Sequence, residues 1–306
     1  MSDISQTELE FRRQATLGSL AAGGGYLVWG LSVMYYRQLK GISPFEILAH
    51  RAVWSLFLVV AFIFIFDRKA KLMALLRERR MVMMLCLTAT IIGVNWIVFI
   101  WAVNEGRILE TSLGYFINPL VSVLTGVALL GERLSRAQAA SIGLAALGVL
   151  YFTVALGYVP WISLFLAVSF AGYGYLKKTI RVDALEGLFV EVLFITPFGL
   201  AYLAWVVSNG GSIVPPSALA GTLLVLTGPM TAIPLLLFTY GAQRIRLTTL
   251  GLLQYLVPTT SFSIAVWVYG EPLGHGQIIT FALIWIGLAI FTFDTWWRER
   301  RVTVAS

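Results

Sequence analysis

SLGYFINPLVSVLTGVALLGERLSRAQ occupies residues 112–138, and GLLQYLVPTTSFSIAVWVYGEPLGHGQ occupies residues 251–277. Each stretch has a proline in an apolar run, which ends in Gly-Glu with a glutamine six residues later. Residues 107–150 align on 246–289 without a gap and are identical at eleven positions, including the proline, the Gly-Glu pair and the glutamine. Leucine and valine match by chance between apolar runs, but these polar and conformationally special residues at one register indicate an internal duplication.

The composition of the chain is that of a membrane protein. Of its 306 residues 58% are hydrophobic and only 12% are charged, whereas a soluble domain has about a quarter of its residues charged. The single cysteine, Cys86, excludes an intrachain disulfide. The sequence has no Cys/His cluster with metal-ligand spacing, no glycine-rich phosphate loop and no nucleophile elbow. We therefore expect no enzyme activity, no metal and no cofactor.

The apolar runs predict an all-α integral membrane protein with ten transmembrane helices. A helix that crosses the hydrocarbon core needs about 20 mainly apolar residues. Ten runs meet this length, at residues 18–36, 44–66, 81–103, 111–130, 137–156, 160–180, 185–207, 217–241, 248–269 and 276–297. The connections are short, and the longest charged one spans 67–80.

The distribution of lysine and arginine predicts the orientation. With both termini in the cytoplasm, 18 of the 22 basic residues lie on the inner side and only Arg37, Lys40 and Arg107 lie outside, while Arg51 is within a helix. This is the bias expected of cytoplasmic loops. The net charge of +7 is thus a topology signal and not a nucleic-acid-binding surface.

The duplication predicts two inverted repeats. The repeated unit has five helices, an odd number, so the second copy enters the membrane from the opposite face. We expect a cytoplasmic segment at 1–17, a first repeat at 18–156, a second repeat at 157–297 and a cytoplasmic tail at 298–306. Transporters built this way bind their solute near the midplane and open to either side in turn.

Five motifs resemble the drug/metabolite transporter superfamily, specifically its EamA family and the RarD-type branch. They are EILAHRAVWS (46–55), NWIVFIWAVNEGRILETSLGYFINPL (95–120), GERLSRAQ (131–138), GPMTAIPLLLF (228–238) and GLLQYLVP (251–258). The resemblance implies ten helices in two EamA repeats, cytoplasmic termini and a permease of the bacterial plasma (inner) membrane. The branch name is associated with chloramphenicol sensitivity, and the superfamily exports amino acids, other metabolites and drugs.

Polar residues near the two prolines are candidates for a substrate cavity. A proline within a helix removes a backbone donor and leaves a carbonyl unpaired. The candidates are Asn95, Trp101, Tyr115, Asn118, Pro119, Tyr173, Gln254, Tyr255 and Pro258. A structural role is open for each: the amides can cap opened turns, Asn95 can bond to a neighbouring helix, and tryptophans can anchor the membrane interface.

Two charges lie deeper in the predicted helices and are candidates for gates or static ion pairs. Arg51 and Glu191 are each about 10 Å from a helix start, in opposite leaflets. The expected partners of Arg51 are Glu46, Glu105 and Glu110, and those of Glu191 are Arg244 and Arg246. Lys177 and Lys178 are expected to extend to the cytoplasmic surface, and Glu132 and Glu271 to pair with neighbouring loops.

The leading functional hypothesis is an exporter of small polar metabolites or drugs, amino acids and chloramphenicol-like compounds among them. No ATP-binding module is recognisable, so transport is either facilitative or secondary-active, with a proton or another ion as coupling partner. The alternative is a membrane sensor or assembly partner that keeps the transporter fold without solute flux. The expected partners are a small-molecule substrate and the lipid bilayer, without nucleic acid, in a monomer or homodimer.

Overall fold

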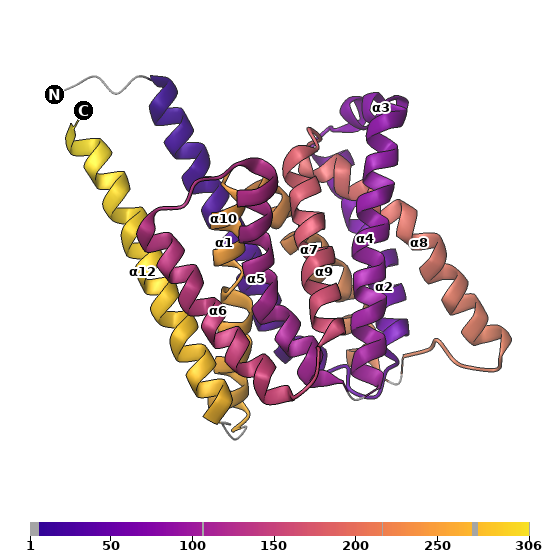
Figure 1. The fold of residues 1–306 in the computed structure, drawn as a ribbon. Helices are drawn as coiled ribbons and strands as arrows, with labels where there is room; N and C mark the ends of the chain where they lie inside the picture. The colour runs from indigo at the N-terminus through magenta and orange to yellow at the C-terminus, as the bar shows by residue number, and fades with distance from the viewer. Residues whose placement is uncertain (1–5, 106, 216, 271–274, 306) are drawn as a thin grey trace.

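A computed structural model describes residues 6–105, 107–215, 217–270 and 275–305, and in these residues the chain is helical with short connections (Figure 1). The helices are α1 (Gln6–Arg37), α2 (Pro44–Ile65), α3 (Lys69–Arg77), α4 (Arg79–Asn104), α5 (Ile108–Leu130), α6 (Arg136–Leu156), α7 (Trp161–Thr179), α8 (Ala184–Ser208), α9 (Ala218–Ala242), α10 (Leu247–Leu253), α11 (Leu256–Ser263), the π-helix η1 (Ile264–Val268) and α12 (His275–Ala305).

Eight stretches of the described residues are long and apolar enough to cross a membrane. They are Arg12–Arg37, Pro44–Ile65, Arg79–Ala102, Leu113–Leu130, Arg136–Val154, Ala184–Ser208, Ala218–Ala242 and Leu247–Val268. A shorter apolar stretch, Ile278–Asp294, lies in α12, and α7 is a further helix of 19 residues. All ten runs expected from the sequence therefore lie on helices, eight of which meet both criteria.

Helical structure extends beyond the predicted runs in three places. Residues 6–17, expected as a segment before the first helix, belong to α1, and residues 298–305 continue α12. The charged connection at 67–80 contains the short helix α3. The polar extensions of α1 and α12 could not be predicted from the apolar runs, because these runs mark only the part of each helix that is apolar.

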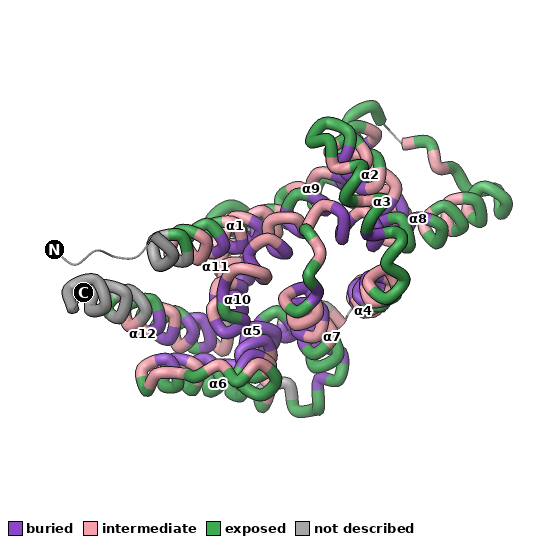
Figure 2. The backbone as a smooth tube through the Cα atoms, turned by 90° about the horizontal axis from the view of Figure 1, so that it is seen from above, coloured by how far each residue is buried: buried purple, intermediate pink, exposed green. Residues whose placement is uncertain are grey.

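The main contacts between helices join helices that are apart in the sequence. α5 packs on α7 and on α10, α1 on α9 and α11, α2 on α8 and α9, and α6 on α12. Seen from above, α6 and α12 lie side by side at one edge, and α2 and α8 lie near the other (Figure 2). The first turns of α1 and the last turns of α12 lie at the same end of the molecule as α3 (Figure 1), which we call the α3 end.

The two repeated prolines have different effects on their helices. The opened turn expected at each proline is absent at Pro119, since α5 continues through it. Before Pro258 the chain does break, between Leu253 and Leu256, and Tyr255 N–H bonds back only three residues, to Leu252 O at 3.1 Å. The missing N–H of Pro258 accounts for this turn, because the carbonyl of Gln254 lacks its donor four residues on and accepts instead from the N–H of Val257 at 3.0 Å.

The helices that carry these prolines cross in direct contact. A Cβ built on Gly251 would lie 2.9 Å from the carbonyl oxygen of Pro119. Only a residue without a side chain allows the backbones of α5 and α10 to approach this closely. The two duplicated segments therefore pack against each other inside the molecule and do not lie on opposite outer walls.

Candidate functional site

The predicted cavity residues nearest to the prolines are buried in this crossing. Asn118, Gln254 and Tyr255 are buried, as are both prolines. The hydroxyl of Tyr255 donates to the carbonyl of Phe116 at 3.3 Å, and the buried Oδ1 of Asn118 accepts no hydrogen bond from the described residues. The structure thus brings these residues together as packing between α5, α10 and α11, with one unsatisfied polar atom.

Three other predicted cavity residues lie apart from this crossing. Asn95 donates from Nδ2 to Leu166 O at 3.0 Å and to Ser169 Oγ at 2.8 Å, and so joins α4 to α7. Trp101 packs near Trp161 with ring centroids 5.8 Å apart. Tyr173 lies beside Glu191 in the charged cluster described below. The nine predicted residues therefore form several groups.

Arg51 is the centre of a polar and aromatic cluster that joins several helices. Its Nε donates to the hydroxyl of Thr231 in α9 at 2.9 Å. Its guanidinium lies 4.5 Å from the ring centroid of Trp96 in α4 and 5.9 Å from that of Tyr36 in α1. Tyr115 in α5 interacts electrostatically with Arg51 and Tyr36. We call Arg51, Tyr36, Trp96, Tyr115 and Thr231 the Arg51 group.

The side chain of Tyr115 is 41% exposed even though it interacts with residues of two other helices. This makes Tyr115, among the residues predicted from the proline motifs, the one best placed to meet a solute at the Arg51 group.

The acidic partners that we expected for Arg51 are not there. Glu110 is buried and pairs with Arg107, whose Nη2 lies 2.6 Å from its Oε1. Glu105 is exposed in the turn after α4, and Glu46 lies partly buried in the first turn of α2. Among the described residues Arg51 forms no ion pair. An arginine within a membrane helix costs about 2.5–3.5 kcal/mol on insertion scales, and here one hydroxyl and aromatic rings offset this cost.

Glu191 has a partner that the sequence analysis did not identify. Its Oε2 lies 3.1 Å from Nζ of Lys177, and both side chains are almost fully buried. Thr88 in α4 donates to Oε1 at 2.5 Å, and the Tyr173 hydroxyl lies 3.4 Å from Oε2. The expectations that Arg244 or Arg246 pairs with Glu191, and that Lys177 reaches the surface, are wrong.

Arg244 and Arg246 have other contacts. Arg244 donates to Gln14 Oε1 at 3.0 Å and stacks on Tyr240. Arg246 Nε lies 3.8 Å from Oε2 of Glu132. Both arginines follow α9, at the α3 end. Their side chains make contacts at this surface and do not bind Glu191.

Glu132 joins the end of α5 to the beginning of α10. Its carboxylate accepts from the backbone N–H of Leu247 at 2.7 Å and of Thr248 at 2.9 Å. A carboxylate at a helix N-terminus is favourable because the first N–H groups lack helical acceptors. This confirms the expected pairing of Glu132 with a neighbouring loop; its repeat mate Glu271 lies outside the described residues.

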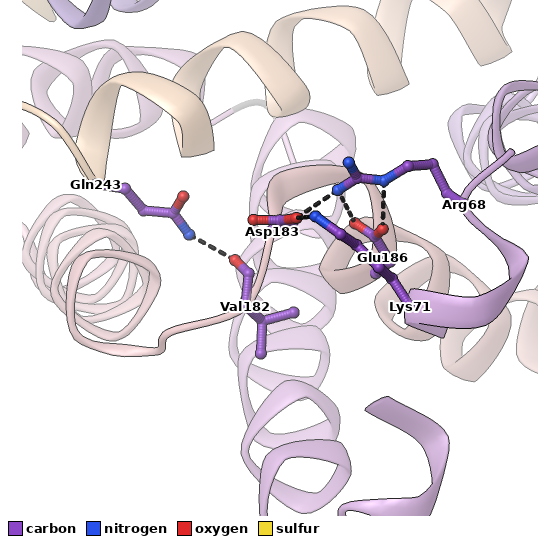
Figure 3. Close-up of polar contacts among 6 residues, drawn as sticks. All are labelled: Arg68, Lys71, Val182, Asp183, Glu186 and Gln243. Atoms are coloured by element: carbon purple, nitrogen blue, oxygen red, sulfur yellow. Dashed lines mark hydrogen bonds and ion pairs between the residues drawn. The ribbon is translucent and has the colours of Figure 1, made fainter. Parts of the chain in front are cut away.

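A group of ion pairs closes the α3 end on the side of α8 (Figure 3). Arg68 binds Asp183 and also Glu186, whose Oε1 lies 2.6 Å from Nε, and Lys71 lies 3.0 Å from Asp183. Nearby, the Gln243 amide donates to the Val182 carbonyl at 2.7 Å. These contacts tie the connection between α2 and α4 to the start of α8.

The charges in this group favour the ionised form of Asp183 at neutral pH. The hydrogen bond from Lys71, followed by the charges of Lys71 and Arg68, lowers the pKa of Asp183. The hydrogen bond to Glu186 raises the pKa of Arg68. Because the pKa of Asp183 is lower in the folded protein, its contribution is present above the usual carboxylate pKa and is lost only as the pH falls through the lowered value. Acidification to pH 5 is therefore not expected to break the contacts of Asp183 with Lys71 and Arg68.

We expect Glu186→Gln to loosen α3 and its connections. The carboxylate of Glu186 is almost fully buried under Arg68, and a hydrogen bond to a charged group contributes about 1.5–3 kcal/mol. Hydrogen exchange of the amides in 67–78 should become faster. The control is Glu78→Gln, since Glu78 is exposed and forms no ion pair among the described residues. Equal exchange in the two variants would contradict the role of Glu186.

Comparison with known proteins places the chain in a family. A family model described as the EamA-like transporter family matches residues 16–154. The chain is 42% identical over 290 residues to Protein RarD of Salmonella typhi, covering 94% of this chain and 99% of that protein. The chain belongs to the EamA-like transporter family, and it is a multi-pass membrane transporter of the bacterial inner membrane.

Two further similarities agree with this assignment. An uncharacterized transporter of Vibrio cholerae is 42% identical over 289 residues, covering 92% of this chain and 94% of that protein. A solved crystal structure with 19% sequence identity superposes with a TM-score of 0.69 over 90% of this chain and 97% of that chain. The second similarity shows a shared fold.

Proposed function

We propose that the protein transports a small solute by alternating access between two inverted five-helix repeats, with ten membrane-spanning helices and both termini in the cytoplasm. The α3 end is then the cytoplasmic end, in agreement with its many basic residues. α7 and the apolar part of α12 complete the ten helices.

The helix pairing supports the inverted repeats. α5 packs on α7, and its repeat counterpart, α10 with α11, packs on α1. Likewise α4 packs on α8, and its counterpart α9 packs on α2. Each of these two contacts between the copies thus has a counterpart in which the copies are exchanged, as expected for repeats related by a pseudo-two-fold axis.

The observation that carries the proposal is the difference between the two ends. Toward the α3 end, the buried Lys177–Glu191 pair and the ion pairs of Arg68 join helices firmly. Toward the other end, Tyr115 in the Arg51 group remains accessible. One closed and one accessible side is the arrangement expected of a transporter in its outward-facing state.

A counterflow assay tests this function. Purified protein in proteoliposomes is loaded with an unlabelled solute, and uptake of the same labelled solute is measured across a panel of amino acids, organic acids and amphenicols. A transporter gives transient accumulation of at least one solute that empty liposomes do not give. A protein that senses or assembles without transport gives none for any solute. We propose export as the direction, which higher retention of that solute in cells lacking the protein would support.

Labelling of introduced cysteines tests the topology. In a Cys86→Ser background, a cysteine placed in 208–215 should react with an impermeant thiol reagent in intact cells. A cysteine placed in 69–77 should react only after permeabilisation. These results follow from cytoplasmic termini and an even number of crossings, and the reverse pattern would contradict the orientation.

A further inference from the structure

Arg51 has donors that the protein does not use. The guanidinium has five N–H groups in a planar fork, and Nε–H is bonded to Thr231. The two terminal nitrogens, Nη1 and Nη2, form no hydrogen bond or ion pair with the residues that the structure describes, and neither is a buried unsatisfied atom. The edge of the guanidinium that is remote from Nε therefore faces accessible space.

We propose that this edge binds the carboxylate of a small organic anion, and that the anion is the class of solute transported. The proposal rests on the proposed function and adds the chemistry of its site. Because Thr231 occupies Nε, the carboxylate would bind end-on, with one oxygen on each terminal nitrogen. Paired N–H···O bonds of this kind are the strong and directional contacts of arginine.

The surroundings of Arg51 fit an anion with an apolar body. The Trp96 ring covers the guanidinium at 4.5 Å, and the accessible ring of Tyr115 lies 5.9 Å from that of Phe99. Aromatic walls around a few fixed polar groups are typical of small-molecule sites. The solute body would pack against these rings while its carboxylate meets Arg51.

The charges of the site disfavour a zwitterion. The Arg51 group contains no carboxylate, and Glu110 is already paired with Arg107. An ammonium group held beside Arg51 would lie near a like charge without a counter-charge from the group. We therefore expect a simple carboxylate to bind more tightly than the corresponding amino acid.

Equilibrium binding to the purified full-length protein in detergent tests the site. The probe is radiolabelled 3-phenylpropionate, and the competitors are 3-phenylpropionamide, phenylalanine and inorganic phosphate. The amide has the same shape without the charge, and it should compete at least about tenfold less well because it forms no charge-assisted pair. Phenylalanine and phosphate should also compete less well, the latter because it lacks an apolar body.

Three variants assign the binding to Arg51. Arg51→Met should abolish saturable binding, and Arg51→Lys should weaken it by about tenfold because a lysine cannot form the paired contact. Thr231→Val removes the acceptor that orients Nε and should weaken binding about three- to tenfold. This variant tests the site if Arg51→Met does not fold. The matched control is Arg37→Met, which loses an arginine–aromatic contact with Tyr269 at the end of α1 and should bind as the wild type does.

The outcomes separate this proposal from the proposed function. Equal competition by the amide or by phosphate, or unchanged binding in folded Arg51→Met and Thr231→Val, overturns the carboxylate site even if counterflow of another solute is found. Binding that depends on Arg51 without any counterflow supports the site and overturns transport.

Discussion

Replacing Lys177 with methionine is expected to lower the free energy of unfolding by about 3–5 kcal/mol, because Glu191 is then left as a buried charge without a counter-ion. Both side chains are almost fully buried, 3.1 Å apart, between α7 and α8. Two hydroxyl groups, those of Thr88 and Tyr173, do not replace the lost positive charge. Unfolding by dodecyl sulfate in mixed micelles, followed by circular dichroism, measures the loss.

Two further variants make this result specific to the pair. Lys178→Met is the neighbouring control: among the described residues Lys178 forms no ion pair, and it donates to the backbone carbonyls of Ala242 and Ile245. The loss of stability in this variant should be smaller. The double variant Lys177→Met with Glu191→Met should recover most of the stability, because an apolar pair of similar volume is often as stable as a buried ion pair. Equal losses in the two lysine variants, with no recovery in the double variant, would show that the pair does not stabilise the fold.

Gly228→Ala is expected to be the second most damaging change. A Cβ at this position would lie 2.6 Å from both the carbonyl carbon and the carbonyl oxygen of Trp54. The backbones of α2 and α9 must separate to admit it, and overpacking of this kind costs about 1–3 kcal/mol and sometimes more. The same unfolding measurement applies.

Gly172→Ala provides the control for the second change. Gly172 is also within a helix, α7, but a Cβ there would meet nothing within 4 Å. Its replacement should be neutral or stabilising by up to about 1 kcal/mol. If Gly228→Ala is as stable as Gly172→Ala, α2 and α9 are not in backbone contact.

The contact at Gly228 also bears on the Arg51 group. Thr231 follows Gly228 by three residues in α9, and Arg51 precedes Trp54 by three residues in α2. Both are thus about one helical turn from the contact. Separation of the two helices at Gly228 should lengthen the bond between Arg51 and Thr231, so Gly228→Ala should also weaken any ligand that binds there.

The sequence predicted the helices well because their signal is local. In lipid, a run of about 20 apolar residues can form all its backbone hydrogen bonds only as a helix. The ends of an apolar run therefore lie close to the ends of the helix that it forms. The different behaviour of Pro119 and Pro258 could not be predicted from their repeat, since the same residue permits a continuous helix or a tight turn depending on what packs beside it.

The site was predicted only in part, because its partners are remote in sequence. Arg51 was identified as an ionisable residue within a helix, but Thr231 is 180 residues away and carries no motif. Lys177 was taken for a surface residue since it lies near a helix end. The signal that could have found it is the pattern Tyr173, Lys177, which places both on one helical face, together with the need of Glu191 for a counter-charge.

Accessibility of a cysteine at position 115, measured from each side of the membrane, tests alternating access most directly. In Cys86→Ser/Tyr115→Cys, the cysteine should react with a small impermeant thiol reagent in intact cells and not in inside-out vesicles. Adding Arg68→Ala and Glu132→Gln removes contacts that close the α3 end and should shift reaction toward the vesicles. Reaction from the same side at the same rate, with and without these changes, would contradict the account.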